Sequence, residues 1–396
     1  MIARLRRQFN ANFTQEKYRK FLQRMDELSG THIDFRICET PCFFPKSLVD
    51  TMAGYGKDLI EQLVNDPSYR TISDQSIPQE YRAPHDENHP LFVAVDFGLV
   101  RDDAGQLQPK LVEIQGFPSL YAYQVLLAQQ YKEVFDLQND LQFFLSGLDA
   151  DSYQALLRKA ILNNHDPQHV ILMEIDPFEQ KTLVDFLLTQ RMCGIEIVNI
   201  TDVEKEGKRL FYRRDERRIP VERIYNRAIV DELVRKGKKL SFSFRDELDV
   251  EWAGHPNWFF RISKFSIPYL KHVSVPKTWF LHQVDSLPDN LERYVLKPLY
   301  SFAGLGVVIG PTGDDVEKIP EEKRSSYILQ EQLDFEPVIE TPHGKTKAEV
   351  RMMYVWLDKL LPVLTIIRMG RGKMMGVDHN KNMEWVGASA GFFLNE

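Results

Sequence analysis

The sequence predicts a mixed α/β protein that contains both antiparallel and parallel strands. Two patterns lead to this prediction. Residues 91–117 hold two apolar runs, LFVAVDFGLV and KLVEIQGF, on either side of the turn RDDAGQ, which is typical of a β-hairpin. Residues 169–200 hold an apolar run (HVILMEI), a helical stretch from Phe178 to Met192 and a second apolar run (IEIVNI), which is the strand, helix, strand order of a parallel α/β layer.

The composition excludes several classes of protein. The chain has 396 residues, 43% of them hydrophobic, which is enough for about two or three domains with real cores. With 50 Lys and Arg against 57 Asp and Glu, the net charge is −7 and the pI is near 5.9, which argues against nucleic acid as the main partner. The three cysteines cannot form a secreted disulfide framework.

The same sequence gives an expectation for location. Its apolar runs all fall short of the roughly 18–20 residues that span a bilayer, so we expect no membrane partner. The basic N-terminal stretch lacks the apolar core of a secretory signal. We therefore expect a cytoplasmic protein, with a mitochondrial targeting peptide as the alternative.

The first part of the chain is predicted to be mainly helical, with loops before the hairpin. A helix should end at about Ser29, a second should cover residues 46–64, and the proline-marked residues 66–90 should be loop. After the hairpin, helical patterns return over residues 119–135 and 152–161. The apolar positions of the first helix include Phe13, Tyr18, Phe21, Leu22 and Met25.

The parallel unit is followed by the most basic segment of the chain, KRLFYRRDERRIPVERIYNR. Basic residues with interleaved aromatics are compatible with an RNA-binding surface, whose contacts would include Arg213, Arg214, Arg217 and Arg218. The alternation fits a solvent-facing hairpin with mixed charges equally well, and we favour that interpretation.

A glycine-rich turn between two apolar strands points to phosphate chemistry. In RYVLKPLYSFAGLGVVIG a strand ends at Lys297, the turn contains Ser301, Gly304 and Gly306, and a second strand follows. Glycines let backbone N–H groups approach an anion, and the lysine adds a fixed positive charge. An ordinary hairpin is the alternative. The segment is neither a Walker A loop nor a dinucleotide fingerprint, since the required residue order is absent.

The segments after this turn favour a nucleotide site. The strand YILQEQL has Gln330, Glu331 and Gln332 near its end, where their polar groups could bind the edge of an adenine base. AEVRMMYVW places Arg351 in an apolar strand, where a charge needs an anionic partner. That partner is either a carboxylate or a phosphate, and we favour phosphate. Arg368 ends a later strand, before a polar loop marked by glycines.

Triphosphate chemistry also needs oxygen ligands for magnesium. Strand alternation puts Glu113 and Gln115 on one face, and the hairpin can bring Asp96 alongside. We expect these three residues to hold Mg²⁺, the alternative being polar positions on a solvated sheet face.

Together these motifs resemble the ATP-grasp superfamily. VLKPLYSFAGLGVVI, YILQEQL, EVRMMYV and the pattern RMG, NKN and GASAG look like its successive elements, and VDFGLVRDDAGQLQPKLVEIQGFPS looks like its magnesium segment. In this chain the magnesium segment precedes the lysine loop. This order resembles that of the circularly permuted branch, which includes eukaryotic glutathione synthetase and the glutathionylspermidine synthetase group. The resemblance covers roughly residues 90–135 and 255–396.

The resemblance implies a permuted ATP-grasp fold with an inserted parallel α/β substrate lobe. Residues 1–90 would pack on the core as a helical segment, and residues 91–160 would carry the magnesium hairpin. Residues 161–240 would form the lobe, and residues 241–396 would bind the nucleotide. The permuted relatives suggest a homodimer.

The resemblance also implies roles for individual residues. Lys297 and the loop 301–306 would hold phosphates, residues 331–333 would form the adenine hinge ending at Leu333, and Glu336 or Glu340 would lie near the ribose. A second lysine is expected at Lys264, with Lys271 and Lys277 as rivals. Arg351, Arg368 and Asn382 would face phosphate or acyl-phosphate oxygens. Substrate contacts are expected from Arg36, Ser119, Arg227 and Gly387.

The implied activity is an ATP- and Mg²⁺-dependent carboxylate–amine ligase that acts on a small-molecule acid and amine through an acyl phosphate. Two departures matter: Gln115 stands where the pattern has asparagine, and the loop lacks the carboxylate that glutathione synthetase offers to magnesium. The alternatives are therefore an ATP-binding sensor or scaffold without turnover, and a small-molecule phosphotransferase.

Overall fold

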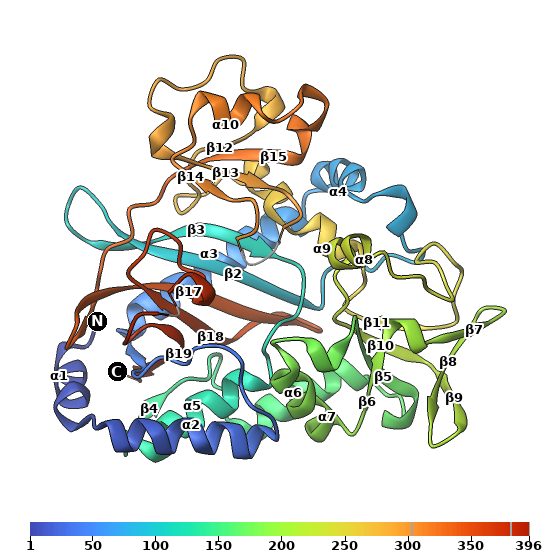
Figure 1. The fold of residues 1–396 in the computed structure, drawn as a ribbon, viewed down its shortest axis with the longest axis horizontal. Coiled ribbons are helices and arrows are strands. Elements are labelled where there is room, and N and C mark those ends of the chain that lie inside the picture. Colours follow the sequence, from blue (N-terminus) through green and yellow to red (C-terminus); the bar gives the residue numbers. More distant parts are fainter. Residues whose placement is uncertain (302–303, 381, 396) are drawn as a thin grey trace.

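The computed structural model describes residues 1–301, 304–380 and 382–395. Its largest element is an eight-stranded sheet in the order β1-β19-β18-β17-β2-β3, with β16 and β4 paired to β17 and β19 (Figure 1). All neighbouring strands are antiparallel except β1 and β19. The strands are β1 (Cys42–Phe43), β2 (Phe92–Arg101), β3 (Leu107–Gln115), β4 (Leu141–Gln142), β16 (Ile339–Thr341), β17 (Gly344–Trp356), β18 (Leu360–Gly370) and β19 (Gly387–Leu394).

The predicted hairpin is confirmed as β2 and β3. Its register places Asp96 opposite Glu113, and Ala94 opposite Gln115. β2 also pairs with β17, so the hairpin is attached to strands that lie more than 200 residues further along the chain. Residues paired directly across antiparallel strands point to the same face of a sheet, so the register fixes which side chains share the face that carries Asp96.

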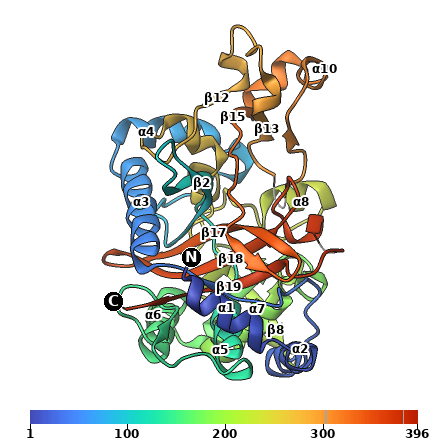
Figure 2. The ribbon, with the colours of Figure 1, turned by 90° about the vertical axis from the view of Figure 1, so that its left-hand side faces the viewer.

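Helices cover both faces of this sheet (Figure 2). The helix predicted over residues 46–64 is confirmed as α3 (Lys46–Val64). It packs against side chains that alternate along β2 and β17, including Val95 and Met352, because every second residue of a strand faces the same way. Gly56 of α3 lies directly over Tyr354, where a Cβ would overlap the tyrosine hydroxyl.

The opposite face is covered mainly by N-terminal helices and α5 (Tyr123–Val134). The first predicted helix is observed as α1 (Ala3–Asn12) and α2 (Gln15–Ser29), which are separated because the Thr14 side chain caps α2. α2 ends at Gly30 in the left-handed conformation. Phe21 stacks on Tyr131 of α5 at 4.5 Å between ring centroids, and this aromatic layer continues the core beneath β18 and β19.

The predicted parallel unit is a four-stranded sheet in the order β11-β10-β5-β6. The helix expected from Phe178 begins later, at Leu183, because Asp176 adopts a left-handed conformation and Pro177 starts a short 3₁₀ turn. An antiparallel ribbon of β7, β8 and β9 extends from this lobe (Figure 1). The elements are β5 (Val170–Glu174), β6 (Glu196–Asn199), β7 (Glu204–Glu206), β8 (Arg209–Arg214), β9 (Arg217–Val221), β10 (Arg223–Asn226), β11 (Glu251–Ala253), α6 (Ala150–Leu162), α7 (Leu183–Cys193) and α8 (Val230–Lys236).

A small antiparallel sheet, β12-β15-β13-β14, lies at the top of the molecule in Figure 1. Among the described residues, no helix has both the length and the apolar character that a membrane span requires. The remaining elements are α4 (Pro67–Ser73), α9 (Asn257–Arg261), β12 (Thr278–Phe280), β13 (Tyr294–Pro298), β14 (Val308–Ile309), α10 (Gly313–Glu317) and β15 (Tyr327–Glu331).

Candidate active site

Two rows of side chains cross the main sheet at the site. In the first row Glu113, Asp96 and Arg351 are successive partners on β3, β2 and β17. In the second row Glu349 of β17 lies opposite Arg368 of β18. Cross-strand partners share a face, so both rows point to the same side of the sheet. This face therefore presents carboxylates and guanidinium groups next to each other.

Asp96 is the centre of a buried ion cluster. Only 2% of the residue is exposed. Arg351 binds both of its oxygens, at 2.6 Å from Nε and 2.8 Å from Nη2, and Nη2 of Arg368 also contacts Asp96. Burial alone would raise the pKa of Asp96, but the two arginines hold it below its ordinary value. Asp96 is thus a carboxylate partner of Arg351 within the chain itself.

Glu349 is the second carboxylate next to Arg368. It is 6% exposed and lies 2.8 Å from Nη2 of that arginine. Burial raises its pKa above the ordinary value, although the arginine opposes this shift. Sequence reasoning missed this residue. The signal was available, because Glu349 and Arg351 are two positions apart in a strand and therefore face the same way.

Lys297 and Lys264 bring two ammonium groups to this region from segments outside the main sheet. Lys297 is the second-last residue of β13, and its Nζ donates to the backbone oxygen of Val112 at 3.1 Å and to the Gln330 side chain. Burial lowers the pKa of Lys297 to about 8. The Nζ of Lys264 lies 2.9 Å from Glu113 Oε1 and 2.6 Å from the Ser301 backbone oxygen. Two ammonium groups from separate segments therefore flank the β3 strand.

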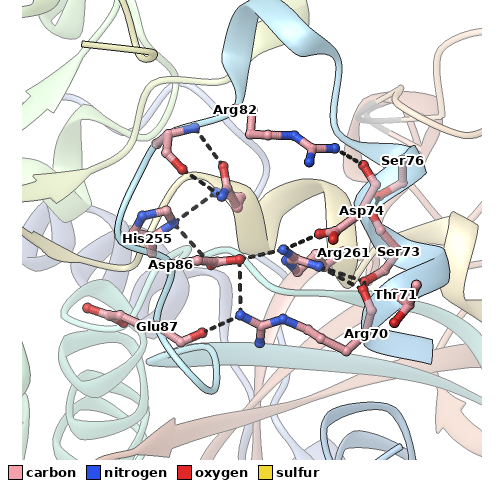
Figure 3. A network of polar contacts seen from close by, with 12 residues as sticks. Arg70, Thr71, Ser73, Asp74, Ser76, Arg82, Asp86, Glu87, His255 and Arg261 are labelled. Carbon is pink, nitrogen blue, oxygen red and sulfur yellow. Dashed lines mark hydrogen bonds and ion pairs between the residues drawn. The ribbon is translucent and has the colours of Figure 1, made fainter. Parts of the chain in front are cut away.

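A polar network holds the segment that carries Lys264 (Figure 3). Arg261, three residues before Lys264, is 3% exposed. Its guanidinium lies 2.6 Å from Asp74 Oδ1 and also contacts Asp86, which is in turn 3.0 Å from Arg70. These ion pairs attach the loop after α4 to α9, so the residues before the hairpin help to fix the position of Lys264.

The predicted hinge, residues 331–333, lies between the last strand of the small sheet, β15, and the first following strand of the main sheet, β16. Just beyond it, Phe335 packs over Gly98 of β2, where a Cβ would overlap the ring. The backbone N–H of Glu336 donates to the Leu99 oxygen at 2.8 Å. Nε2 of Gln330 is buried and has no hydrogen-bond partner among the described residues, so it is available to a ligand.

These elements enclose a cavity of about 670 Å³ between the two antiparallel sheets and the parallel lobe. Its size suits a nucleotide-sized or drug-sized ligand. Of the three candidate second lysines, Lys264 lines the cavity, whereas Lys271 and Lys277 are exposed and do not. The predicted residues that line it are Glu113, Gln115, Ser119, Arg227, Lys264, Lys297, Ser301, Gly304, Gln330, Glu331, Gln332, Leu333, Arg351 and Arg368.

Other predicted residues lie outside the lining of this cavity. Asp96 is covered by its arginines, Glu336 lies 3.0 Å from Arg101, and Asn382 is exposed to solvent. The side chain of Arg36 pairs with Glu39, although the neighbouring Phe35 does line the cavity. Gly387 and Gly306 are also not among the lining residues. Residues 302 and 303 of the predicted phosphate loop are outside the described part of the chain.

The parallel lobe contributes a buried arginine that was predicted and a carboxylate that was not. Arg227 is 4% exposed, and its Nε and Nη1 have no hydrogen-bond partner among the described residues. Its guanidinium lies 4.9 Å from the centroid of the Phe117 ring. Glu174 lines the same end of the cavity, and burial raises its pKa to about 8.

The basic ribbon of the lobe is paired internally. Arg213 lies 2.6 Å and Arg218 3.1 Å from Glu204, and Arg214 lies 3.6 Å from Glu196. A second depression, of about 750 Å³, is lined by residues of this region, including Glu196 and Glu204, and none of its lining residues is shared with the lysine-bearing cavity. The mixed-charge hairpin interpretation is the one that these pairs favour.

The fold is similar to that of a known protein. A glutathione synthetase-like effector from Globodera pallida, solved in the apo form, superposes with a TM-score of 0.58 at 12% sequence identity, over 91% of this chain and 90% of the effector chain. At this identity the similarity concerns the fold alone, and it supports a mixed α+β architecture of the glutathione synthetase type. No family model and no curated protein sequence matches the chain.

Proposed function

We propose that the chain is an ATP- and Mg²⁺-dependent carboxylate–amine ligase with a circularly permuted ATP-grasp fold. The observation that supports this most strongly is the convergence of Lys264, Lys297 and Glu113, from three separate segments, on one cavity. Two ammonium groups facing carboxylate and amide oxygens match the charges of a triphosphate and its magnesium ion. The adjacent hinge, with the unpaired Nε2 of Gln330, suits the edge of an adenine base.

In the proposed reaction a substrate carboxylate oxygen attacks the γ-phosphorus of ATP, which gives an acyl phosphate and ADP. A substrate amine then attacks the acyl carbon, the bond to phosphate breaks, and the nitrogen loses a proton as the amide forms. Lys264 and Lys297 would neutralise phosphate charge, and Arg351 and Arg368 line the cavity where a carboxylate would react. These steps need position and charge, and no side-chain nucleophile.

The metal set that we propose differs from the expectation based on sequence. Among the described residues, no group of three or more His, Cys, Asp or Glu side chains is arranged to hold a metal ion. Glu113 and Gln115 line the cavity and offer oxygen ligands, whereas both oxygens of Asp96 already bind arginines. Glu349 also lines the cavity and can replace the carboxylate that the loop lacks. Mg²⁺ keeps several waters, so Glu113, Gln115 and Glu349 would be sufficient.

A second, non-reacting carboxylate of the substrates is proposed to meet Arg227. Nε and Nη1 of this buried guanidinium have no hydrogen-bond partner among the described residues, and a ligand carboxylate fits their fork geometry. Glu174 and Gln180 line the same end of the cavity and can accept or donate hydrogen bonds to an amino group. An amino acid or small peptide therefore matches this end of the site.

Turnover provides the direct test. Purified protein with ATP, Mg²⁺ and pools of amino acids and small peptides should release ADP and phosphate only when an acid and an amine are both present. Release of AMP and pyrophosphate would contradict the mechanism. Replacement Lys297→Ala should weaken binding of an ATP analogue by about tenfold to a hundredfold, since a charge-assisted contact is lost. The exposed Lys277→Ala serves as the matched control and should leave the affinity unchanged.

A nucleotide sensor without turnover is the second candidate. The observations that favour it are Gln115 in the metal set and the tight pairing of Arg368 with Asp96 and Glu349. This candidate predicts that ATP raises the thermal unfolding temperature while no substrate pool yields ADP. Product formation from any pair of substrates rules it out.

A further inference from the structure

One end of the cavity is apolar, beyond the two rows of charged residues. Each row of charged residues continues into an apolar residue on the next strand. Ile366 of β18 lies opposite Arg351, and Ala388 of β19 lies opposite Arg368. Ile366 and Arg368 are two positions apart on β18 and face the same way. The apolar residues that line the cavity include Phe35, Leu120, Ile366, Met374, Met375 and Ala388.

The segment that carries Phe35 is held in place by backbone hydrogen bonds between its next residues and Ala388. The N–H of Ala388 donates to the Arg36 oxygen at 2.9 Å, and the N–H of Cys38 donates to the Ala388 oxygen at 2.8 Å. The Phe35 ring meets Tyr123 edge to face, with 5.4 Å between centroids. The aromatic wall of this end is therefore anchored to the sheet and not left to a free loop.

Leu120 reaches the cavity from a strained backbone. Its φ is 61°, in the left-handed region that a leucine rarely adopts. The buried Asp185 carboxylate accepts hydrogen bonds from the N–H groups of Leu120 at 3.2 Å, Ala122 at 2.9 Å and Tyr123 at 3.0 Å. Such strain persists only where surrounding contacts enforce it, and it occurs preferentially at ligand sites. It places an apolar side chain in the wall of the cavity that Phe35 also lines.

Arg368 stands at the border between the charged and the apolar part. Its ion pairs with Asp96 and Glu349 both use Nη2. Within the described part of the chain, its Nε and Nη1 make no hydrogen bond, and the side chain is 25% exposed. A carboxylate can therefore bind Arg368 while the rest of the ligand extends over Ile366 and Ala388.

We infer that this end of the cavity binds the apolar side chain of an amino-acid substrate, such as leucine, methionine or phenylalanine, whose carboxylate meets Arg368. The inference rests on the proposed function and names a substrate class for it. A glycine would leave the surfaces of Phe35, Leu120 and Ile366 without contacts, whereas a larger apolar side chain would cover them. Met374 and Met375 have flexible, polarizable side chains that can adapt to its shape.

Calorimetric titration of the full chain tests this inference. Leucine, methionine, phenylalanine and glycine are titrated in the presence of Mg²⁺ and a non-hydrolysable ATP analogue. Each apolar amino acid should bind at least about tenfold more tightly than glycine. Equal affinities, or no binding of any of the four, would overturn the inference.

A matched pair of variants locates the effect. Met374→Asp should weaken leucine binding at least about tenfold, because it places a charge in the apolar wall. Met383→Asp is the control, since Met383 is 37% exposed and does not line the cavity. Met374→Ala, which only removes apolar contact, should shift the affinity in the same direction by less. Equal effects of the two Asp variants would overturn the assignment.

Nucleotide binding is measured in a separate titration, so that two failures can be told apart. Binding of the ATP analogue without any side-chain preference overturns this inference and leaves the ligase proposal standing. A preference for apolar amino acids in a protein that does not bind the nucleotide overturns the ligase proposal and leaves the apolar subsite standing.

Discussion

Replacing Asp96 by Asn should destabilise the protein strongly, because Asp96 neutralises two arginines in a buried cluster. Three guanidinium nitrogens contact its two oxygens, and the residue is almost fully buried. Removing one partner of such a cluster leaves uncompensated charge, which costs about 3–5 kcal/mol. Asn keeps the shape and one acceptor, so we expect a loss near 3 kcal/mol, which raises the unfolding constant by roughly a hundredfold.

Urea unfolding followed by tryptophan fluorescence measures this loss. The matched control is Asp334→Asn, because Asp334 pairs with Arg293 at 3.1 Å while both side chains are exposed. That pair should contribute less than about 1 kcal/mol. Since the arginines hold the pKa of Asp96 below its ordinary value, its contribution is present above about pH 4 and is lost as pH falls through the lower folded pKa.

Two results would refute this reasoning. Equal losses in Asp96→Asn and Asp334→Asn would mean that the buried cluster is no stronger than a surface pair. Unchanged stability combined with lost Mn²⁺ binding, read by electron paramagnetic resonance, would mean that Asp96 is a metal ligand and not the counter-ion of the arginines.

Three more predictions follow from the site and the sheet. Because burial lowers the pKa of Lys297 to about 8, the affinity for an ATP analogue should fall as pH rises through 8. Lys297→Arg should retain binding to higher pH, and a flat wild-type profile would contradict this reasoning. Gly98→Ala should cost about 1–3 kcal/mol in urea unfolding by displacing Phe335, whereas Gly54→Ala, in open space on α3, should not destabilise. Glu174 keeps a proton in the folded state up to about pH 8, so stability should fall between about pH 4.5 and 8, and thermal unfolding of Glu174→Gln should lose that slope.

Local patterns were sufficient for much of the fold. Helix α3 has the predicted bounds, and the β2–β3 hairpin pairs Asp96 with Glu113 as expected, because periodicity and turn residues act over short stretches of chain. Helix α7 begins later than its apolar pattern indicates. There, a left-handed Asp176 and the following proline override the helical periodicity.

The partners of site residues were harder to predict, because they depend on strand pairing between distant segments. Asp96 has the residue type and the face of a magnesium ligand, but Arg351 and Arg368, which bind it, lie 255 and 272 positions away in the chain. The cavity position of Phe35, next to the predicted Arg36, likewise depends on pairing with β19. Glu349 is different, since simple alternation from Arg351 identifies it.

The strand order also has a consequence for biosynthesis. The middle of the main sheet comes from residues 344–394, whereas its flanking strands β1, β2 and β3 come from residues 42–115. On a ribosome that extends the chain from its N-terminus, β1 and β2 emerge long before β19 and β17, with which they pair. Their unpaired apolar edges would stay accessible during translation, which favours engagement by chaperones and makes the nascent chain prone to aggregation. Slowing translation after residue 115 should therefore lower the soluble yield more than slowing it after residue 370.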